Sequence, residues 1–152
     1  MATKHAVSGS ITITPIWYDE LPHAQVGLDD KILYDDHIET EQKICFNDNL
    51  DQGNHRLWVR FSNKKDNDTK GNLDKAIVVD KIDFFGIDSK RFVWQGLYEP
   101  IYPQQMLQQS KQLESKLRYH NYLGWNGLWY LDFSSPIFTW IHQVESLGWI
   151  YD

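Results

Sequence analysis

Residues 119–133 read YHNYLGWNGLWYLDF, an aromatic stretch centred on the pair Asn126-Gly127. Asn-Gly is a strong signal for a β-hairpin, because a type I′ turn needs a positive φ at both central residues. A two-residue turn sets the register of the two strands, so Trp125 is expected to face Leu128, and Gly124 to face Trp129. The stretch therefore predicts an antiparallel strand pair.

Successive side chains of a strand point to opposite faces, so this hairpin has two predicted faces. The predicted core face carries Tyr122, Trp129, Leu131 and Phe133. The other face carries Leu123, Trp125, Leu128 and Tyr130, and it is too apolar to lie bare in water. Another part of the chain or a partner must cover it.

A predicted C-terminal helix is the first candidate for that cover. In SSPIFTWIHQVESLGW, Ser135 is the expected N-cap, Pro136 the first helical residue, and Gly148 the end. Its apolar stripe must be buried, over the hairpin or across an end of the fold. The stripe consists of Ile137, Trp140, Ile141, Val144 and Leu147.

Short strand patterns fill most of the remaining chain. HRLWVRFSN (55–63) is the clearest, with Leu57, Val59 and Phe61 on one face and Trp58 on the other. Residues 104–118 fit either a helix or an exposed loop. The pattern predicts an all-β fold, a single-domain antiparallel β-sandwich of jelly-roll type over residues 1–152 with a short C-terminal helix. Further strands are expected at 10–18, 37–48, 75–87 and 91–103.

Composition excludes several classes of function. The net charge is -6 and no Lys/Arg cluster is present, which argues against binding to nucleic acid. No apolar run approaches the ~20 residues of a membrane span, and no apolar signal core follows Met1. Cys45 is the only cysteine, and its place in KICF predicts a buried structural thiol.

The chain carries no motif for catalysis. A nucleophile elbow, a phosphate-binding glycine loop and paired zinc histidines are all missing from the sequence, so we expect no enzyme activity. A glycan hydrolase would need two carboxyl groups across a cleft, and spacing alone identifies no such pair.

Two acidic clusters have the residue types of metal ligands. KKDNDTKGN places Asp66, Asn67 and Asp68 in one loop, which suits calcium, although the neighbouring lysines favour a solvated turn. The second cluster is DDHIE, at 35–39, where a solvated strand edge is again the favoured interpretation. We therefore expect no cofactor, with calcium as the alternative.

Two aromatic sets have the residue types of a sugar-binding surface, in which rings meet the C–H faces of pyranoses and polar groups bind hydroxyls. A tryptophan in a strand equally fits a core position. One set is Trp94, Tyr98 and Tyr102 with Gln95 and Glu99. The other is Trp125 and Tyr130 with Asn121 and Asp132.

DKAIVVDKIDFFGIDSKRFVWQGLYEPIYP (74–103) and YLGWNGLWYLDFSSPIFTWIHQVESLG (122–148) resemble small virion structural proteins of contractile-tailed phages, notably those of marine cyanobacteria. The strand pattern of this half is also similar to jelly-roll carbohydrate-binding modules, which often bind calcium.

The first resemblance implies a capsid-decorating, neck or tail protein, made in the host cytoplasm without a signal peptide and located in the virion. It would dock on other virion proteins or on a second copy. The expected interface is Leu123, Trp125, Leu128, Tyr130 and Trp140. The alternative is a module that recognises a cell-surface glycan through Trp94, Gln95, Tyr98, Glu99 and Tyr102.

Overall fold

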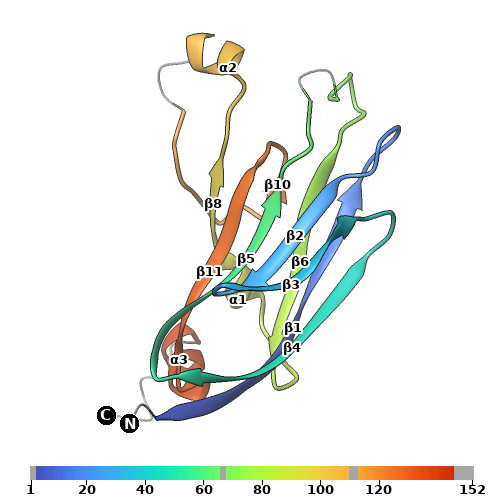
Figure 1. Cartoon of the computed structure of the whole chain (residues 1–152). Coiled ribbons are helices and arrows are strands. Elements are labelled where there is room, and N and C mark those ends of the chain that lie inside the picture. The colour runs from blue at the N-terminus through green and yellow to red at the C-terminus, as the bar shows by residue number, and fades with distance from the viewer. Residues whose placement is uncertain (1–2, 66–67, 110–112, 146–152) are drawn as a thin grey trace.

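Two antiparallel β-sheets lie face to face in the computed structural model, which describes residues 3–65, 68–109 and 113–145 (Figure 1). Within these residues one sheet has the order β10-β6-β1-β4, with β7 paired to β6, and the other has the order β3-β2-β5-β11-β8-β9. The predicted all-β sandwich with a short C-terminal helix is confirmed. The first sheet comprises β1 (Lys4–Ile16), β4 (Gln42–Asp51), β6 (Ala76–Phe84), β7 (Ile87–Asp88) and β10 (Tyr122–Leu123). The second comprises β2 (His23–Leu28), β3 (Lys31–His37), β5 (Gly53–Phe61), β8 (Leu97–Pro100), β9 (Leu117–Arg118) and β11 (Gly127–Ser135).

The core lies between the sheets and is closed at one end by α3 (Ile137–Val144). The ring of Phe84 lies 5.4 Å from that of Phe133 and 5.8 Å from that of Trp140, measured between centroids. Burial of such rings stabilises the closed end, because each removes a large apolar area from water. The predicted helix is confirmed, although Pro136 rather than Ser135 is its N-cap. Gly148 lies outside the described residues.

The predicted hairpin at Asn126-Gly127 is wrong. β10 pairs with β6 in one sheet, whereas β11 pairs with β5 and β8 in the other, so the chain crosses between the sheets here. The Asn126 side chain accepts a hydrogen bond from Lys64 N at 2.7 Å and donates one to Lys64 O at 3.0 Å. At Gly127 a Cβ would lie 2.4 Å from the carbonyl oxygen of Glu99. Asn126 therefore fixes the crossover to the Lys64 backbone, and Gly127 lets the chain pass close to the backbone of Glu99.

The strand predicted over 91–103 is interrupted by a helix, α1 (Lys90–Trp94). Ser89 caps this helix by accepting a hydrogen bond from Arg91 N at 3.2 Å. At Gly96 a Cβ would lie 2.1 Å from the Trp129 ring, so the glycine makes room for that buried indole. Only β8 retains the predicted strand.

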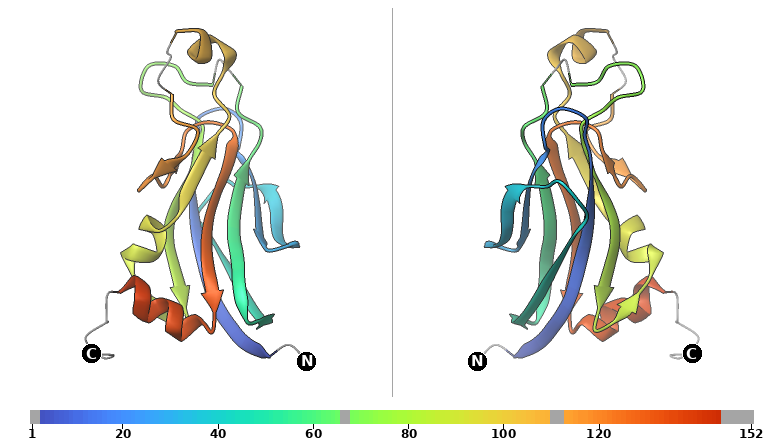
Figure 2. Two further views of the ribbon diagram at one scale, coloured as in Figure 1. Left: turned by 90° about the vertical axis from the view of Figure 1, so that its left-hand side faces the viewer. Right: turned by 90° about the vertical axis from the view of Figure 1, so that its right-hand side faces the viewer.

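The uncertain region 104–118 begins as a helix, α2 (Gln104–Gln109), and ends in β9. In Figure 2, α2 lies beyond the end of the sandwich opposite α3. None of the helices within the described ranges is long and apolar enough to cross a membrane.

Cys45 is exposed, contrary to the prediction of a buried thiol. Ile44 and Phe46 on either side are buried in the core, so the alternation of β4 directs the intervening side chain outward.

Candidate functional site

The outer face of the six-stranded sheet carries an outward-facing tryptophan, Trp58, between two arginines. Leu57, Val59 and Phe61 are buried, as predicted, so the alternate positions of β5 face solvent. This sheet lies toward the viewer in Figure 1.

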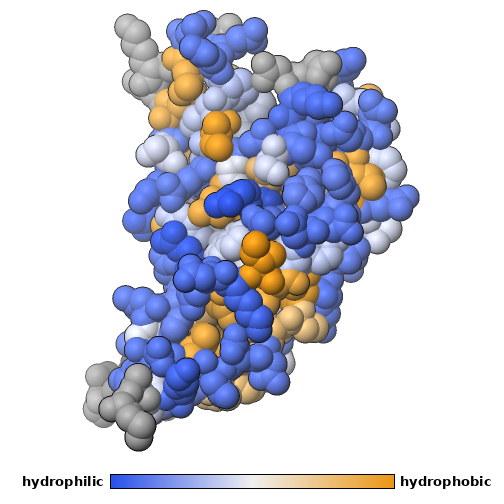
Figure 3. Space-filling model, viewed as in Figure 1, coloured by the Kyte–Doolittle hydropathy of each residue, from blue (hydrophilic) through white to orange (hydrophobic). Residues whose placement is uncertain are grey.

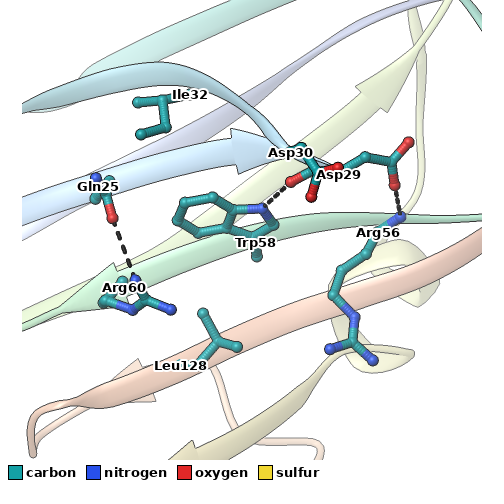
Figure 4. Close-up of a pocket in the computed structure, with 8 residues that line it drawn as sticks. All are labelled: Gln25, Asp29, Asp30, Ile32, Arg56, Trp58, Arg60 and Leu128. Atoms are coloured by element: carbon teal, nitrogen blue, oxygen red, sulfur yellow. Dashed lines mark hydrogen bonds between the residues drawn. The ribbon is translucent and has the colours of Figure 1, made fainter.

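The indole of Trp58 lies flat along the sheet over Gly27 of β2. The two residues are directly paired across the strands, and a Cβ on Gly27 would lie 2.1 Å from Cζ2 of the indole. The indole Nε1–H donates a hydrogen bond to the Asp29 carbonyl oxygen at 2.9 Å. One ring face is therefore held against backbone, and the other faces the surface hollow drawn in Figure 4.

Polar side chains surround this ring. Arg60 Nη1 donates to Gln25 Oε1 at 3.4 Å, and the Arg60 guanidinium carbon lies 5.4 Å from the Trp58 ring centroid. Figure 4 shows Arg60 and Arg56 toward opposite ends of the indole, with Ile32 and Leu128 along its two sides. An apolar floor with polar ends is a common form of small-ligand site.

Arg56 forms a two-pronged ion pair with Asp132 and covers Tyr130. Its Nε donates to Oδ1 at 2.7 Å and its Nη2 to Oδ2 at 3.1 Å, while its guanidinium carbon lies 3.8 Å from the Tyr130 ring centroid. The hydrogen bonds that Arg56 donates to Asp132 raise the pKa of Arg56. Burial, together with a hydrogen bond to Glu99, raises the pKa of Tyr130 to about 12.

His55 holds the turn that bears Asp29. Its Nδ1 lies 2.6 Å from Asp29 Oδ2 and its Nε2 lies 2.6 Å from the Asp51 carbonyl oxygen. The other Asp29 oxygen accepts from Arg56 N at 2.8 Å. Desolvation lowers the pKa of His55, but the hydrogen bonds to Asp51 and Asp29 outweigh it, so the pKa is raised. The Asp29 carbonyl in turn accepts the hydrogen bond from the Trp58 indole, so His55 helps to position Trp58 by way of Asp29.

Two hollows on this face meet at Arg60 and Leu128. The first has a volume of about 610 Å³, and the second, beside β8, about 340 Å³. Because they share two lining residues, the two hollows are adjacent on the sheet, and together they are here called the Trp58 trough. The first hollow is lined by Gln25, Asp29, Asp30, Ile32, Arg56, Trp58, Arg60 and Leu128. The second is lined by Arg60, Phe61, Ser62, Glu99, Ile101, Asn126, Gly127 and Leu128.

The predicted glycan contacts do not form one surface. Tyr98 is fully buried, with its hydroxyl hydrogen-bonded to the Trp125 carbonyl, and Tyr102 donates to the Glu114 carbonyl at 2.8 Å. Glu99 lines the Trp58 trough, whereas Trp94 and Gln95 line a separate hollow of about 530 Å³ with Tyr119, Arg91 and Val144. Helix α1 separates these residues because it replaces the expected strand alternation.

The predicted apolar interface is not an exposed face. Leu123 is fully buried and Trp140 is 8 % exposed, both within the core. Tyr130 is 3 % exposed beneath Arg56, and Trp125 has the Lys64 ammonium 4.6 Å from its ring centroid. Leu128 lines the Trp58 trough. The prediction depended on the hairpin register, which the crossover removes.

Buried lysines pair with the acidic residues near the loop that has the residue types of a calcium site. Lys75 Nζ lies 2.7 Å from Glu20 Oε1 and 3.5 Å from Asp68 Oδ2, and Lys64 Nζ lies 2.6 Å from Asp74 Oδ1. Burial alone would raise the pKa of Asp74, but hydrogen bonds from Lys64 and Tyr122 hold it below its usual value. Asp66 and Asn67 lie outside the described residues.

The second acidic cluster, at 35–39, lies on an exposed strand edge. His23 Nε2 forms a 2.6 Å contact with Asp35 Oδ1, and its ring lies 5.0 Å from that of His37. Over the described ranges, no three His, Cys, Asp or Glu side chains converge as metal ligands.

Comparison with known families and with curated proteins finds no match. One solved structure, described as vCBM60 in complex with galactobiose, is similar over 84 % of this chain and 97 % of that chain, at 12 % identity and a TM-score of 0.49. The expected virion family has no counterpart among these comparisons.

Proposed function

We propose that the protein is a non-catalytic carbohydrate-binding module and that the Trp58 trough is its binding site. The observation that carries this proposal is the indole of Trp58, fixed flat over Gly27 with one face toward the trough. The electron-rich face of an indole attracts the slightly positive C–H groups on the apolar face of a pyranose. Fixing the ring in advance lowers the entropy cost of binding.

The polar groups around the ring have the roles that a sugar requires. The Gln25 carboxamide and the Arg60 guanidinium lie at one end of the indole, and Asp30 lies near the other. Amides, guanidinium groups and carboxylates can each bind hydroxyl groups of a sugar. The trough extends from Ile32 to Ile101, which gives an oligosaccharide room beyond the unit on Trp58.

The carboxylates of the first hollow favour binding over hydrolysis. Glycosidases place two carboxyl groups on either side of the scissile bond. Asp29 and Asp30 are adjacent in one turn, and Figure 4 shows both at the same end of the indole. Asp29 is also occupied by His55 and by the backbone N–H of Arg56.

Binding to a glycan panel tests the proposal with three variants, in each of which one tryptophan is replaced by alanine. We expect the wild type to bind at least one oligosaccharide, and Trp58→Ala to lose that binding. Trp94→Ala and Trp17→Ala should retain that binding. Trp94 lies in the separate hollow, and Trp17 is 38 % exposed. Equal retention by all three variants, or loss only in Trp94→Ala, would reject the Trp58 trough as the site.

Docking on another virion protein is the second candidate. Ile101 is 70 % exposed and Ile32 is 52 % exposed, and a protein partner would cover such side chains. On the face seen in Figure 3, however, apolar side chains form small patches between hydrophilic ones. Stable protein interfaces usually have a larger apolar centre. Co-sedimentation of the purified chain with phage particles would test this candidate, and Ile101→Asp should abolish any specific association.

A further inference from the structure

Arg60 lies where the two hollows of the Trp58 trough meet. It faces outward from β5, directly opposite Gln25 on one neighbouring strand and Leu128 on the other. Its guanidinium carbon is 5.4 Å from the Trp58 ring centroid. A group extending from the edge of a sugar stacked on the indole would therefore reach this guanidinium.

The positive charge of Arg60 is not neutralised by a carboxylate within the described part of the chain. Among the described residues, no Asp or Glu oxygen lies within 4.0 Å of the Arg60 guanidinium nitrogens. Arg60 instead donates a hydrogen bond to the neutral Gln25 carboxamide at 3.4 Å. Arg56 differs, because both carboxylate oxygens of Asp132 accept hydrogen bonds from its guanidinium. Of the two arginines in the trough, Arg60 is the one available to a ligand.

The carboxylates of the trough are directed elsewhere or lie away from Arg60. Asp29 binds His55 and the Arg56 backbone, and Glu99 lies on β8, in the second hollow. Asp30 lies near the opposite end of the indole from Arg60 (Figure 4). An anionic ligand group beside Arg60 therefore meets a positive charge, although the whole chain has a net charge of -6.

We propose that the trough selects an acidic glycan, in which a pyranose stacks on Trp58 and its anionic substituent binds Arg60. This inference rests on the proposed function. A uronic acid suits the geometry, because its carboxylate projects from the edge of the ring and matches the planar guanidinium with two parallel hydrogen bonds. Gln25 orients the guanidinium.

Titration calorimetry with paired ligands tests the inference. The probes are an oligogalacturonide and its methyl ester, which keep the same rings and linkages and differ in charge. An alginate oligomer serves as a second uronate, and a sulfated galactan oligomer distinguishes sulfate from carboxylate. We expect the acid to bind about 10- to 100-fold more tightly than its ester, and this preference to weaken as salt is raised.

Three variants test whether Arg60 causes the preference for the acid over its ester. Arg60→Gln should bind the acid and the ester with equal affinity, and Arg60→Lys should keep part of the preference for the acid. Arg91→Gln, an exposed arginine outside the trough, should behave as wild type. Equal binding of acid and ester by the wild type, or an acid preference that survives Arg60→Gln, would overturn the inference and leave the proposed function intact. A sulfate preference without uronate binding would overturn the choice of uronate. Failure of acidic and neutral glycans alike to bind would remove both proposals.

Discussion

Gly27 of β2 lies directly beneath the indole of Trp58 on β5, and no side chain larger than hydrogen fits between them. This contact makes a flat aromatic platform from two residues that are distant in the chain. Because the ring rests on backbone, its open face can receive a ligand without a large conformational change.

Gly27→Ala is expected to displace the indole, since the new Cβ would lie 2.1 Å from the ring. Overpacking of this kind costs about 1–3 kcal/mol of unfolding free energy, and glycan affinity should fall with it. Denaturant unfolding and ligand titration measure the two effects. In a Trp58→Ala background the same substitution should cost much less, because the clash is gone. Equal costs in both backgrounds would show that the indole does not rest on Gly27.

His55 is expected to give stability that is strongest in mild acid. Its folded-state pKa is raised above the ordinary value, so its contribution is complete below the unfolded pKa of 6.5 and is lost as pH rises through the folded pKa. The charged groups facing the ring are the Asp29 carboxylate and Asp51. Unfolding free energies of wild type and His55→Gln, measured from pH 5 to pH 9, should therefore converge toward high pH. A difference that stays constant or grows with pH contradicts the arrangement.

Lys75 is expected to stabilise the loop end of the sandwich. Its side chain is 2 % exposed and donates to Glu20 and to the Asn63 carbonyl, both at 2.7 Å. Lys75→Met should cost about 1–3 kcal/mol of unfolding free energy, because the partly buried Asn63 carbonyl loses its donor. Lys81→Met is the control, since Lys81 is 56 % exposed and pairs with Asp88 at the surface, where ion pairs contribute little to stability. Similar losses in the two variants would argue against a structural role for Lys75.

Removal of calcium is expected to leave the protein unchanged. The Lys75 and Lys64 ammonium groups already lie beside Asp68 and Asp74, so positive charge is supplied by the chain. Thermal unfolding with a chelator or with added calcium should give the same midpoint. A midpoint raised by several degrees with calcium would indicate a site that involves the loop at 66–68.

Local patterning predicted the layers of the fold and much of the orientation of its strands. The buried Leu57, Val59 and Phe61 follow from period-two alternation, which also directs Trp58 outward. The C-terminal helix follows from its apolar stripe. These features depend on neighbouring residues in the chain, so sequence alone could indicate them.

The crossover and the binding platform depend on contacts between distant segments. The Asn126-Gly127 sequence fits a hairpin turn as well as this crossover. The hydrogen bonds between the Asn126 side chain and the Lys64 backbone favour the crossover. The alternation in the sequence directs Trp58 outward but does not mark it as part of a binding site. The sequence shows a tryptophan between Arg56 and Arg60. That this tryptophan forms a flat platform depends on its pairing with Gly27, which the sequence does not show.

The indole N–H resonances of the seven tryptophans provide the most direct test of the Trp58 platform. Each can be assigned by single substitution and followed while an oligosaccharide from the panel is added. With the sugar bound in the Trp58 trough, the Trp58 resonance should show the largest ligand-dependent shift, and the Trp94 resonance should stay unchanged. A largest shift at Trp94 would place the sugar beside Tyr119, and would contradict the claim that the Trp58 trough is the binding site.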